Sequence, residues 1–469
     1  MARRSSITAI KRYRWQELGL FIIPFMILLL EMIQLLLARS LRTGVVQTSS
    51  LTVKNLPTIE GLIPVLGLIA VLLGINLLLS FTFPKADQVL LPLVGLLSGI
   101  GVLMATRLGP NLLPFPDPAL GSRQLLWVIV GLVAFLVTLF GLRNMTWLRR
   151  YKYTWALLGI ILVGITLAHS LRANLDSPTH DQLNVGPLNL QPSELLKIFL
   201  VIFFAAYLSE NIDIVSGGNL RIGPLRLPPF RQLGPLALML GLALLLFLGI
   251  RELGLALLIY GIFLVMIYLG SGKISYVIGS LLIFFVLGFI GYALFSYVRS
   301  RFAVVGIDVT SWTAKSEDLY QKTGGGFQIV QGLIALANGG IIGTGIGLGH
   351  PTFVPVVQSD MIFTALGEEL GLAGLFAIIG IYLLIIYRGY RIAIQARDSF
   401  NQLLASGLTS IFAIQTLIIT AGNMKFLPLT GIPLPFLSYG GSSILANYII
   451  IGILLRISHN TAREREGLA

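Results

Sequence analysis

Long apolar segments constrain this chain more than any other feature of its sequence. Hydrophobic residues make up 55% of its 469 residues and charged residues only 11%, whereas a soluble domain carries about 25% charged residues. A membrane-spanning helix needs about 20 apolar residues. The sequence therefore predicts an all-α polytopic membrane protein with about 12 transmembrane helices. Their predicted ranges are 17–38, 60–82, 88–106, 124–142, 152–170, 192–209, 233–250, 252–270, 274–297, 360–387, 403–423 and 440–457.

Basic residues set the predicted orientation. Lys and Arg gather in cytoplasmic loops, and several precede the first apolar segment, so we expect both termini in the cytoplasm. Arg39, Arg42 and Lys54 in the first outer loop are an exception to this pattern. The net charge of +13 then reflects topology and anionic lipid headgroups, and it does not indicate nucleic acid. No cleavable signal is expected, because the first apolar stretch is long and lacks a small-residue cleavage site.

Composition also excludes several kinds of site. The chain has no cysteine, which rules out disulfides, thiolate zinc sites and cysteine nucleophiles. With only four histidines, an imidazole-rich metal centre is not expected. The chemistry must therefore come from carboxylates, basic side chains and hydroxyls.

The longest connection covers residues 298–359 and is predicted to be a large extracytoplasmic loop. Long loops in compact architectures are usually functional or disordered. Its glycine-rich stretch, residues 339–349, superficially resembles a phosphate cradle but lacks the Gly-Lys-Ser/Thr ending and a preceding strand. Tight packing of a re-entrant or surface helix is the favoured interpretation.

Asp360 stands where this loop returns to apolar sequence. A charged side chain at membrane depth is costly and marks a candidate functional site, and a carboxylate there can act as a base on a substrate held at the membrane surface. Glu368 and Glu369 follow about two helical turns later. Asp is also a favoured N-cap residue, so a purely structural role for Asp360 is the alternative.

Two other groups of polar residues are predicted on the same outer side. Glu194 and Lys197 lie three residues apart at the start of a helix, so they share a face and can pair. The pair is either part of a site or a salt bridge that fixes two helices. Arg251 and Arg301 add positive charge, which suits a phosphorylated, lipid-linked substrate. A rigid loop rich in proline, glycine and hydroxyls, residues 430–442, enters the last helix.

Four motifs in this order resemble the SEDS family, the RodA and FtsW group of peptidoglycan polymerases. The resemblance covers roughly residues 88–457, a ten-helix core, and the two helices before it are similar to those of longer RodA-like members. It implies a cytoplasmic basic N-terminus and two additional helices in residues 1–87, and a cytoplasmic tail in residues 458–469. The motifs are Gln191-Pro192-Ser193-Glu194-x-x-Lys197, Gly326-Phe327-Gln328-x-x-Gln331, Ser359-Asp360-x-Ile362-Phe363-x-x-x-Gly367-Glu368-Glu369-Leu370-Gly371 and Pro433-x-Pro435-Phe436-x-Ser438-Tyr439-Gly440-Gly441-Ser442.

The resemblance implies a glycosyltransferase that polymerises lipid II at the outer face of the bacterial cytoplasmic membrane. Asp360 matches the family's extracytoplasmic aspartate and would be the general base. The other implied substrate-binding residues are Glu194, Lys197, Arg251, Arg301, Gln328, Glu368, Glu369 and Ser438. The leaving group, undecaprenyl pyrophosphate, would need positive charge from these cations or from a divalent cation, Mg²⁺ or Mn²⁺. The implied protein partner is a class B penicillin-binding protein, a transpeptidase.

Two departures from the family pattern keep other functions open. Asp181-Gln182 stands where the family usually has Arg-Trp, and Arg251-Glu252 where it usually has Pro-Asp. A flippase for lipid-linked precursors would use the same cavity charges without a general base. A non-catalytic scaffold of the cell-wall synthesis complex would need neither.

Overall fold

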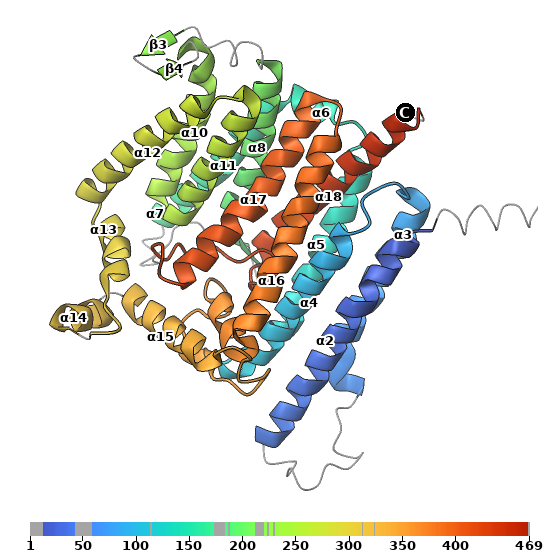
Figure 1. The fold of residues 1–469 in the computed structure, drawn as a ribbon, viewed down its shortest axis with the longest axis vertical. Coiled ribbons are helices and arrows are strands. Elements are labelled where there is room, and N and C mark those ends of the chain that lie inside the picture. Colours follow the sequence, from blue (N-terminus) through green and yellow to red (C-terminus); the bar gives the residue numbers. More distant parts are fainter. Residues whose placement is uncertain are drawn as a thin grey trace, which may run out of the picture. The chain divides into compact units, whose positions relative to one another are not determined.

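The chain folds almost entirely into helices (Figure 1). The computed structural model describes residues 13–42, 59–112, 115–172, 183–185, 188–211, 220–222, 225–227, 230–311, 313–322 and 324–467. The long apolar helices are α2 (Trp15–Arg42), α3 (Ile59–Thr82), α4 (Leu90–Leu108), α5 (Leu120–Gly141), α7 (Lys152–Arg172), α8 (Pro192–Glu210), α10 (Phe230–Gly249), α11 (Leu253–Ser271), α12 (Ile274–Leu294), α16 (Ile362–Gln395), α17 (Ser399–Asn423) and α18 (Gly441–Arg465).

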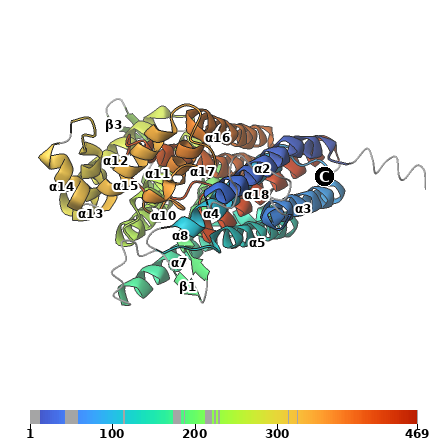
Figure 2. The ribbon, with the colours of Figure 1, turned by 90° about the horizontal axis from the view of Figure 1, so that it is seen from below.

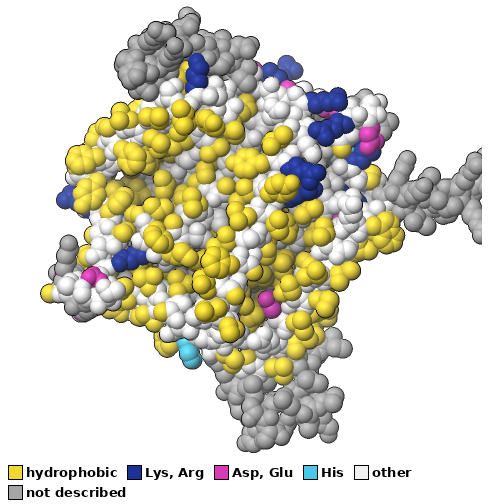
Figure 3. Space-filling model, in the orientation of Figure 1, with side chains coloured by type: hydrophobic (Ala, Val, Ile, Leu, Met, Phe, Trp, Pro, Cys, Tyr) yellow, Lys and Arg dark blue, Asp and Glu magenta, His cyan; other side chains and the backbone are white. Residues whose placement is uncertain are grey.

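Each predicted apolar segment corresponds to one of these helices. Among the described residues, eleven helices are long and apolar enough to cross a membrane, and the described apolar part of α10 is shorter. Large apolar side chains cover most of the helical surface drawn in Figure 3. On α12, for example, Phe289 is 75% exposed. Such a surface suits lipid, where only helices with internally satisfied backbones are stable. The chain is thus a multi-pass membrane protein.

Shorter elements connect the long helices. The short helices are α6 (Thr146–Arg150), α13 (Ser296–Ala303), α14 (Ala314–Lys322), α15 (Gly324–Gly339) and the 3₁₀ turns η2 (Gly109–Asn111), η3 (Val304–Gly306) and η4 (Pro351–Phe353). Two small antiparallel hairpins pair β1 (Leu183–Val185) with β2 (Leu188–Leu190) and β3 (Leu220–Ile222) with β4 (Leu225–Leu227).

The structure differs from the sequence prediction at two places. The segment 298–359, predicted as a loop, contains most of α13 and all of α14 and α15. The segment 458–469, predicted as a separate tail, continues α18 as far as Arg465. α18 continues because helical hydrogen bonds are internal to the helix, so a helix need not end where apolar sequence ends. The helices within 298–359 are too short or too polar to span a membrane, so hydropathy did not predict them.

The helices form two compact units. Unit 1 comprises Met1–Leu139, Gln331–Arg388 and Pro433–Ala469, and unit 2 comprises Phe140–Val330 and Gly389–Ile432. In unit 1, α2 packs against both α3 and α4, as the views of Figures 1 and 2 agree. In unit 2, α8 packs against α7 and α17, and α17 also packs against α11. The predicted division of the sequence at residue 87 stays a prediction.

A buried arginine ties α2 and α3 to the rest of unit 1. The Arg14 side chain is fully buried and pairs with Glu17. It also donates hydrogen bonds to the carbonyl oxygens of Phe83 and Asp87, just beyond the end of α3. The Asp87 carboxylate in turn pairs with Arg388 near the end of α16. These contacts satisfy charges that would otherwise be costly to bury.

The glycine-rich stretch folds against a kink in α16. The kink lies at Gly371, where φ is +67° and the helical hydrogen bonds are interrupted. Two amides of the stretch donate to the carbonyls that end the first part of the helix, and two amides that begin the second part donate back. These bonds are Thr344 N to Glu368 O (2.9 Å), Gly345 N to Glu369 O (3.0 Å), Leu372 N to Gly340 O (3.0 Å) and Ala373 N to Ile341 O (3.1 Å). We call residues 340–345 and 368–373 together the interlock.

The two segments of the interlock approach each other so closely that only glycine fits at positions 343 and 371. A Cβ atom on Gly371 would lie 2.3 Å from the amide nitrogen of Gly343, and one on Gly343 would lie 2.3 Å from the Glu369 carbonyl oxygen. Both residues also have positive φ, which only glycine adopts without strain. The tight packing favoured from the sequence is therefore present in this stretch, but residues 340–349 form turns and not the expected re-entrant or surface helix.

This packing predicts a strong effect of one added methyl group. Gly371→Ala should lower the free energy of unfolding by about 2 kcal/mol or more, because the methyl group meets backbone and the φ is strained. Gly380→Ala on the same helix is the control, since a Cβ there meets nothing within 4 Å. It should remain within about 1 kcal/mol of the wild type. Melting curves of the purified protein in detergent would check both, and equal stability of the two variants would contradict the interlock.

Candidate active site

Asp360 lies in unit 1, in the turn that leads into α16. The helix begins at Ile362, two residues later than the predicted span, so Asp360 and Glu368 do not share a helix. The Asp360 side chain is 9% exposed. Burial of this kind keeps most water away from the carboxylate, so the protein groups around it determine its environment.

The loop before α18 fixes the backbone that precedes Asp360. The Ser438 hydroxyl donates a hydrogen bond of 2.5 Å to the carbonyl of Ser359 and accepts one of 2.7 Å from the amide of Leu434. The amide of Tyr439 donates to the carbonyl of Gln358 at 2.8 Å. Ser438 is only 2% exposed. These bonds fix the backbone beside Asp360, and the predicted contact of Ser438 with substrate stays a prediction.

Glu369 pairs with an arginine that the sequence analysis missed. Arg107, at the end of α4, approaches Glu369 with its Nε at 3.0 Å and donates from Nη2 to the carbonyl of Gly349 at 2.9 Å. Both side chains are buried. The sequence signal for it is a lone charge one residue beyond the predicted span 88–106. Through these contacts Arg107 joins α4 to the first part of α16 and to Gly349 at the end of the glycine-rich stretch.

Glu368 also bonds to the loop before α16, at His350. Its Oε1 accepts a hydrogen bond of 3.0 Å from the amide of His350. Its Oε2 is buried and has no hydrogen-bond partner among the described residues. Glu368 and Glu369, both predicted to bind substrate, therefore hold residues 349–350 in place.

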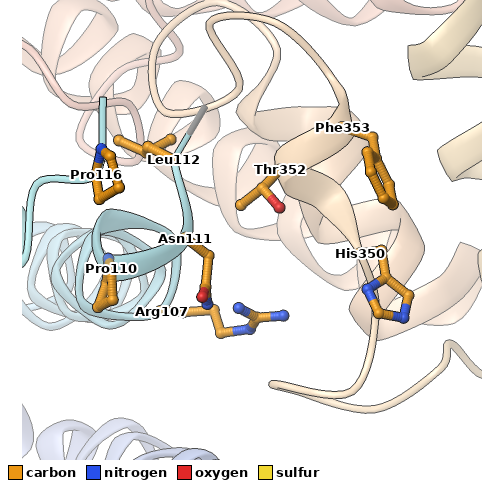
Figure 4. Close-up of a pocket in the computed structure, with 8 residues that line it drawn as sticks. All are labelled: Arg107, Pro110, Asn111, Leu112, Pro116, His350, Thr352 and Phe353. Atoms are coloured by element: carbon orange, nitrogen blue, oxygen red, sulfur yellow. The ribbon is translucent and has the colours of Figure 1, made fainter. Parts of the chain in front are cut away.

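A pocket opens beside this ion pair. It has a volume of about 350 Å³. Figure 4 shows Arg107 and Asn111 from the α4 end facing His350, Thr352 and Phe353 from the loop around η4. The remaining lining residues are Pro110, Leu112 and Pro116. The pocket combines a guanidinium, an amide, a hydroxyl and an aromatic ring, a set that suits a polar organic group.

In unit 2, the predicted pair of Glu194 and Lys197 is confirmed. Lys197 Nζ lies 2.7 Å from Glu194 Oε2 and 3.1 Å from the side-chain oxygen of Gln415 on α17. Lys197 is completely buried. Pro192 occupies the first turn of α8, as predicted. Because its ammonium is already satisfied by two partners, Lys197 joins α8 to α17.

The other predicted residues of unit 2 lie outside this buried pair. Arg251 is exposed in the turn between α10 and α11, and Arg301 is half-buried on α13. Gln328 is half-buried on α15. The departure at Asp181-Gln182 lies outside the described residues.

Two titratable groups outside the spanning helices are perturbed. Hydrogen bonds from Ser311 and Thr310 hold the pKa of the exposed Asp308 carboxyl well below its usual range. A lowered pKa contributes stability above the unfolded pKa, and this contribution is lost as the pH falls through the folded value. Burial raises the pKa of the Tyr297 hydroxyl, against the opposite effect of the Arg251 charge.

The described residues do not provide a protein-only metal site. No group of three or more His, Asp or Glu side chains among them could hold a metal ion. The divalent cation expected from the family resemblance stays a prediction.

Comparison with known proteins identifies relatives over most of the chain. The family of cell cycle proteins that groups FtsW, RodA and SpoVE matches residues 88–463. The peptidoglycan glycosyltransferase RodA of Mycobacterium tuberculosis is 38% identical over 384 residues, 81% of this chain and 79% of the relative. The probable peptidoglycan glycosyltransferase FtsW of Trichlorobacter lovleyi is 30% identical over 385 residues, 81% of this chain and 94% of the relative.

Solved structures share the fold. A chain of a peptidoglycan synthase complex aligns with a TM-score of 0.62 and 21% identity, over 80% of this chain and 98% of that chain. The rod shape determining protein RodA of Thermus thermophilus aligns with a TM-score of 0.52 and 21% identity, over 80% of this chain and 97% of that chain. At this identity the likeness concerns the fold alone.

The buried ion pair allows a test of the site's architecture. Arg107→Met should lower the free energy of unfolding by about 3–5 kcal/mol, because it leaves the Glu369 carboxylate buried without its partner. The double variant Arg107→Met, Glu369→Met removes both charges and should recover most of that loss. Melting curves of the single and double variants would measure the coupling. Additive losses would contradict a direct buried pair.

Proposed function

The chain belongs to the FtsW, RodA and SpoVE family and is a peptidoglycan glycosyltransferase, and we propose that it polymerises lipid II with Asp360 as its general base. The observation that carries the proposal is the placement of Asp360. It is a buried carboxylate two residues before the N-terminal end of α16. Hydrogen bonds from Ser438 and Tyr439 fix the backbone that precedes it. Fixed geometry is what a base requires before its pKa matters.

In the proposed reaction two lipid-linked glycans meet at the outer leaflet. The 4-hydroxyl of the acceptor GlcNAc attacks the anomeric carbon of the donor MurNAc, and Asp360 accepts the hydroxyl proton. The new glycosidic bond forms as the bond from the anomeric carbon to the pyrophosphate oxygen breaks, with inversion. Undecaprenyl pyrophosphate leaves with the bonding electrons. General base catalysis of this kind contributes about 100- to 10,000-fold to a rate.

The carboxylates beside Asp360 have a supporting role in this proposal. Glu368 and Glu369 hold the loop at residues 349–350 through His350 and Arg107. A misplacement of about 1 Å can cost about 100-fold in rate. The interlock and the two glutamates therefore matter because they limit the movement of the segment that leads into α16.

The location of the reaction follows from the basic residues of the sequence. We propose that both termini face the cytoplasm of a bacterial cell and that Asp360 faces the opposite side of the cytoplasmic membrane. A divalent cation, Mg²⁺ or Mn²⁺, would reach the site on the pyrophosphate and add positive charge for the leaving group.

A transpeptidase partner completes the proposal. A structural neighbour of this chain comes from a peptidoglycan synthase complex in which polymerisation and crosslinking are coordinated. We propose a class B penicillin-binding protein as the partner of this chain, because a new glycan strand must be crosslinked to strengthen the wall.

Replacement of Asp360 tests the function directly. With lipid II and a divalent cation, the wild type should form long glycan strands, and Asp360→Asn should be slower by about 100-fold or more. Asp308→Asn is the control, since Asp308 is exposed and held by its own turn, and it should keep its rate within about twofold. Strands of wild-type length and rate from a folded Asp360→Asn protein would refute the base, and no strands from the wild type would favour a flippase or scaffold.

Ser438→Ala distinguishes positioning from substrate binding. If Ser438 positions Asp360, kcat should fall roughly 10- to 100-fold with little change in KM. Ser122→Ala serves as a control, because Ser122 is exposed and bonds only within its own turn. Steady-state polymerisation rates would measure both variants. A higher KM with unchanged kcat would instead make Ser438 a substrate-binding residue.

A further inference from the structure

The departing pyrophosphate of the proposed reaction needs positive charge, and the structure narrows the candidates in unit 2. Lys197 is buried and already satisfied by Glu194 and Gln415. Lys425 donates to the carbonyl of Ile307, which directly precedes the Asp308 carboxylate. Of the cations that the sequence predicted to bind substrate, Arg251 and Arg301 remain. The following inference rests on the proposed function and concerns these two arginines.

Three segments that are distant in sequence meet around these arginines. The Tyr297 hydroxyl on α13 donates to the carbonyl of Leu248 at the end of α10, at 3.2 Å. Gly254 on α11 lies so close to the loop before α18 that an added Cβ would be 2.6 Å from the Thr430 carbonyl oxygen. The α10–α11 turn, α13 and residues 429–432 therefore form one rim of unit 2, labelled by its helices in Figure 1.

Arg301 is anchored to this rim by part of its guanidinium. Its Nη1 donates to the carbonyl of Leu429 at 2.9 Å. The side chain is half-buried. A guanidinium has five N–H donors, so one anchoring bond orients the group and leaves its charge uncompensated by that neutral carbonyl.

Arg251 is held in an unusual conformation. Its φ is +63°, in the left-handed region that non-glycine residues rarely adopt. Strained residues of this kind cluster at functional sites. The side chain is exposed, and its charge reaches Tyr297, which lies one helical turn before Arg301 on α13. Because Tyr297 also bonds to Leu248, Arg251 lies on the same rim as Arg301, next to the buried Glu252.

We propose that Arg251 and Arg301 form a binding site for a lipid-borne phosphate group. A guanidinium matches phosphate geometry with two parallel hydrogen bonds, and the surrounding apolar helices suit a hydrocarbon tail. The phosphate is either the pyrophosphate of the polyprenyl leaving group or the headgroup of an anionic phospholipid. Arg251 stands where the family usually has proline, so the site uses a feature of this chain.

Binding measurements on the full-length protein test the site without relying on catalysis. The first probe is a short-chain polyprenyl pyrophosphate added to protein in zwitterionic detergent. The second is phosphatidylglycerol in nanodiscs otherwise made of phosphatidylcholine. The variants are Arg251→Gln and Arg301→Gln, and the control is Arg299→Gln. Arg299 is exposed on the same short helix and bonds locally to the Ala293 carbonyl, and it lies on roughly the opposite helical face from Arg301.

We expect both test variants to bind the pyrophosphate probe about tenfold more weakly than the wild type, with the control unchanged. Loss of phosphatidylglycerol binding in the test variants, with pyrophosphate binding unaffected, would also support the site and identify a phospholipid as its ligand. The proposal would be overturned if Arg251→Gln and Arg301→Gln bound both probes as tightly as the wild type, or if Arg299→Gln lost as much affinity as they did. Melting temperatures verify that each variant is folded.

The same experiment separates this site from the proposed function. Asp360→Asn should bind the pyrophosphate probe as tightly as the wild type, because it removes no cation. If Asp360→Asn retained polymerase activity, the proposed base would fail while the phosphate site could still stand. If both arginine variants bound the probe as tightly as the wild type while Asp360→Asn lost activity, only the phosphate site would be refuted.

Discussion

The four backbone hydrogen bonds of the interlock are the constraint on which the candidate site depends. A kinked helix exposes carbonyls on one side of the break and amides on the other, and each is costly to leave unpaired at membrane depth. Residues 340–345 supply all four partners. Only glycine permits the required approach at positions 343 and 371. The short helix that follows Asp360 is thereby fixed at its far end.

Side chains also fix the segment between the interlock and Asp360. Arg107 reaches from α4 to Glu369 and to the carbonyl of Gly349, so the loop cannot move away from α4 without exposing a buried charge. At the other end of the same short helix, Ser438 holds the backbone before Asp360. The carboxylate therefore sits between two anchors in unit 1. In unit 2 the comparable charged pair, Glu194 and Lys197, is anchored to α17 by Gln415.

Hydropathy was enough to predict the membrane-spanning helices, because a spanning helix must be long and apolar. It could not predict where they end, since α18 keeps its internal hydrogen bonds through charged residues as far as Arg465. It also missed α14 and α15, which are too short or too polar to span a membrane. The pairing of Glu194 with Lys197 was predictable from their helical spacing. The partner of Glu369 was not, because Arg107 lies 262 residues away in sequence.

Several motif residues make hydrogen bonds that the sequence could not predict, and their substrate contacts stay predictions. Ser438, Glu368 and Glu369 are predicted substrate contacts, and in the structure their hydrogen bonds also fix the segments around Asp360. A one-dimensional pattern cannot distinguish a residue that touches substrate from one that positions its neighbour. At Arg251 the sequence shows a departure from the family pattern. The structure adds its left-handed backbone and the contact of its turn with α13, where the Tyr297 hydroxyl donates to the Leu248 carbonyl.

Amide hydrogen exchange at Thr344, Gly345, Leu372 and Ala373 is the most direct measurement of the central claim, that the interlock holds the segment carrying Asp360. We predict protection at all four amides comparable to that of the α16 interior, although Thr344 and Gly345 lie outside any helix. Protection should fall at all four together in Gly371→Ala. Exchange at Thr344 and Gly345 as fast as in an exposed loop of the wild type would contradict the claim.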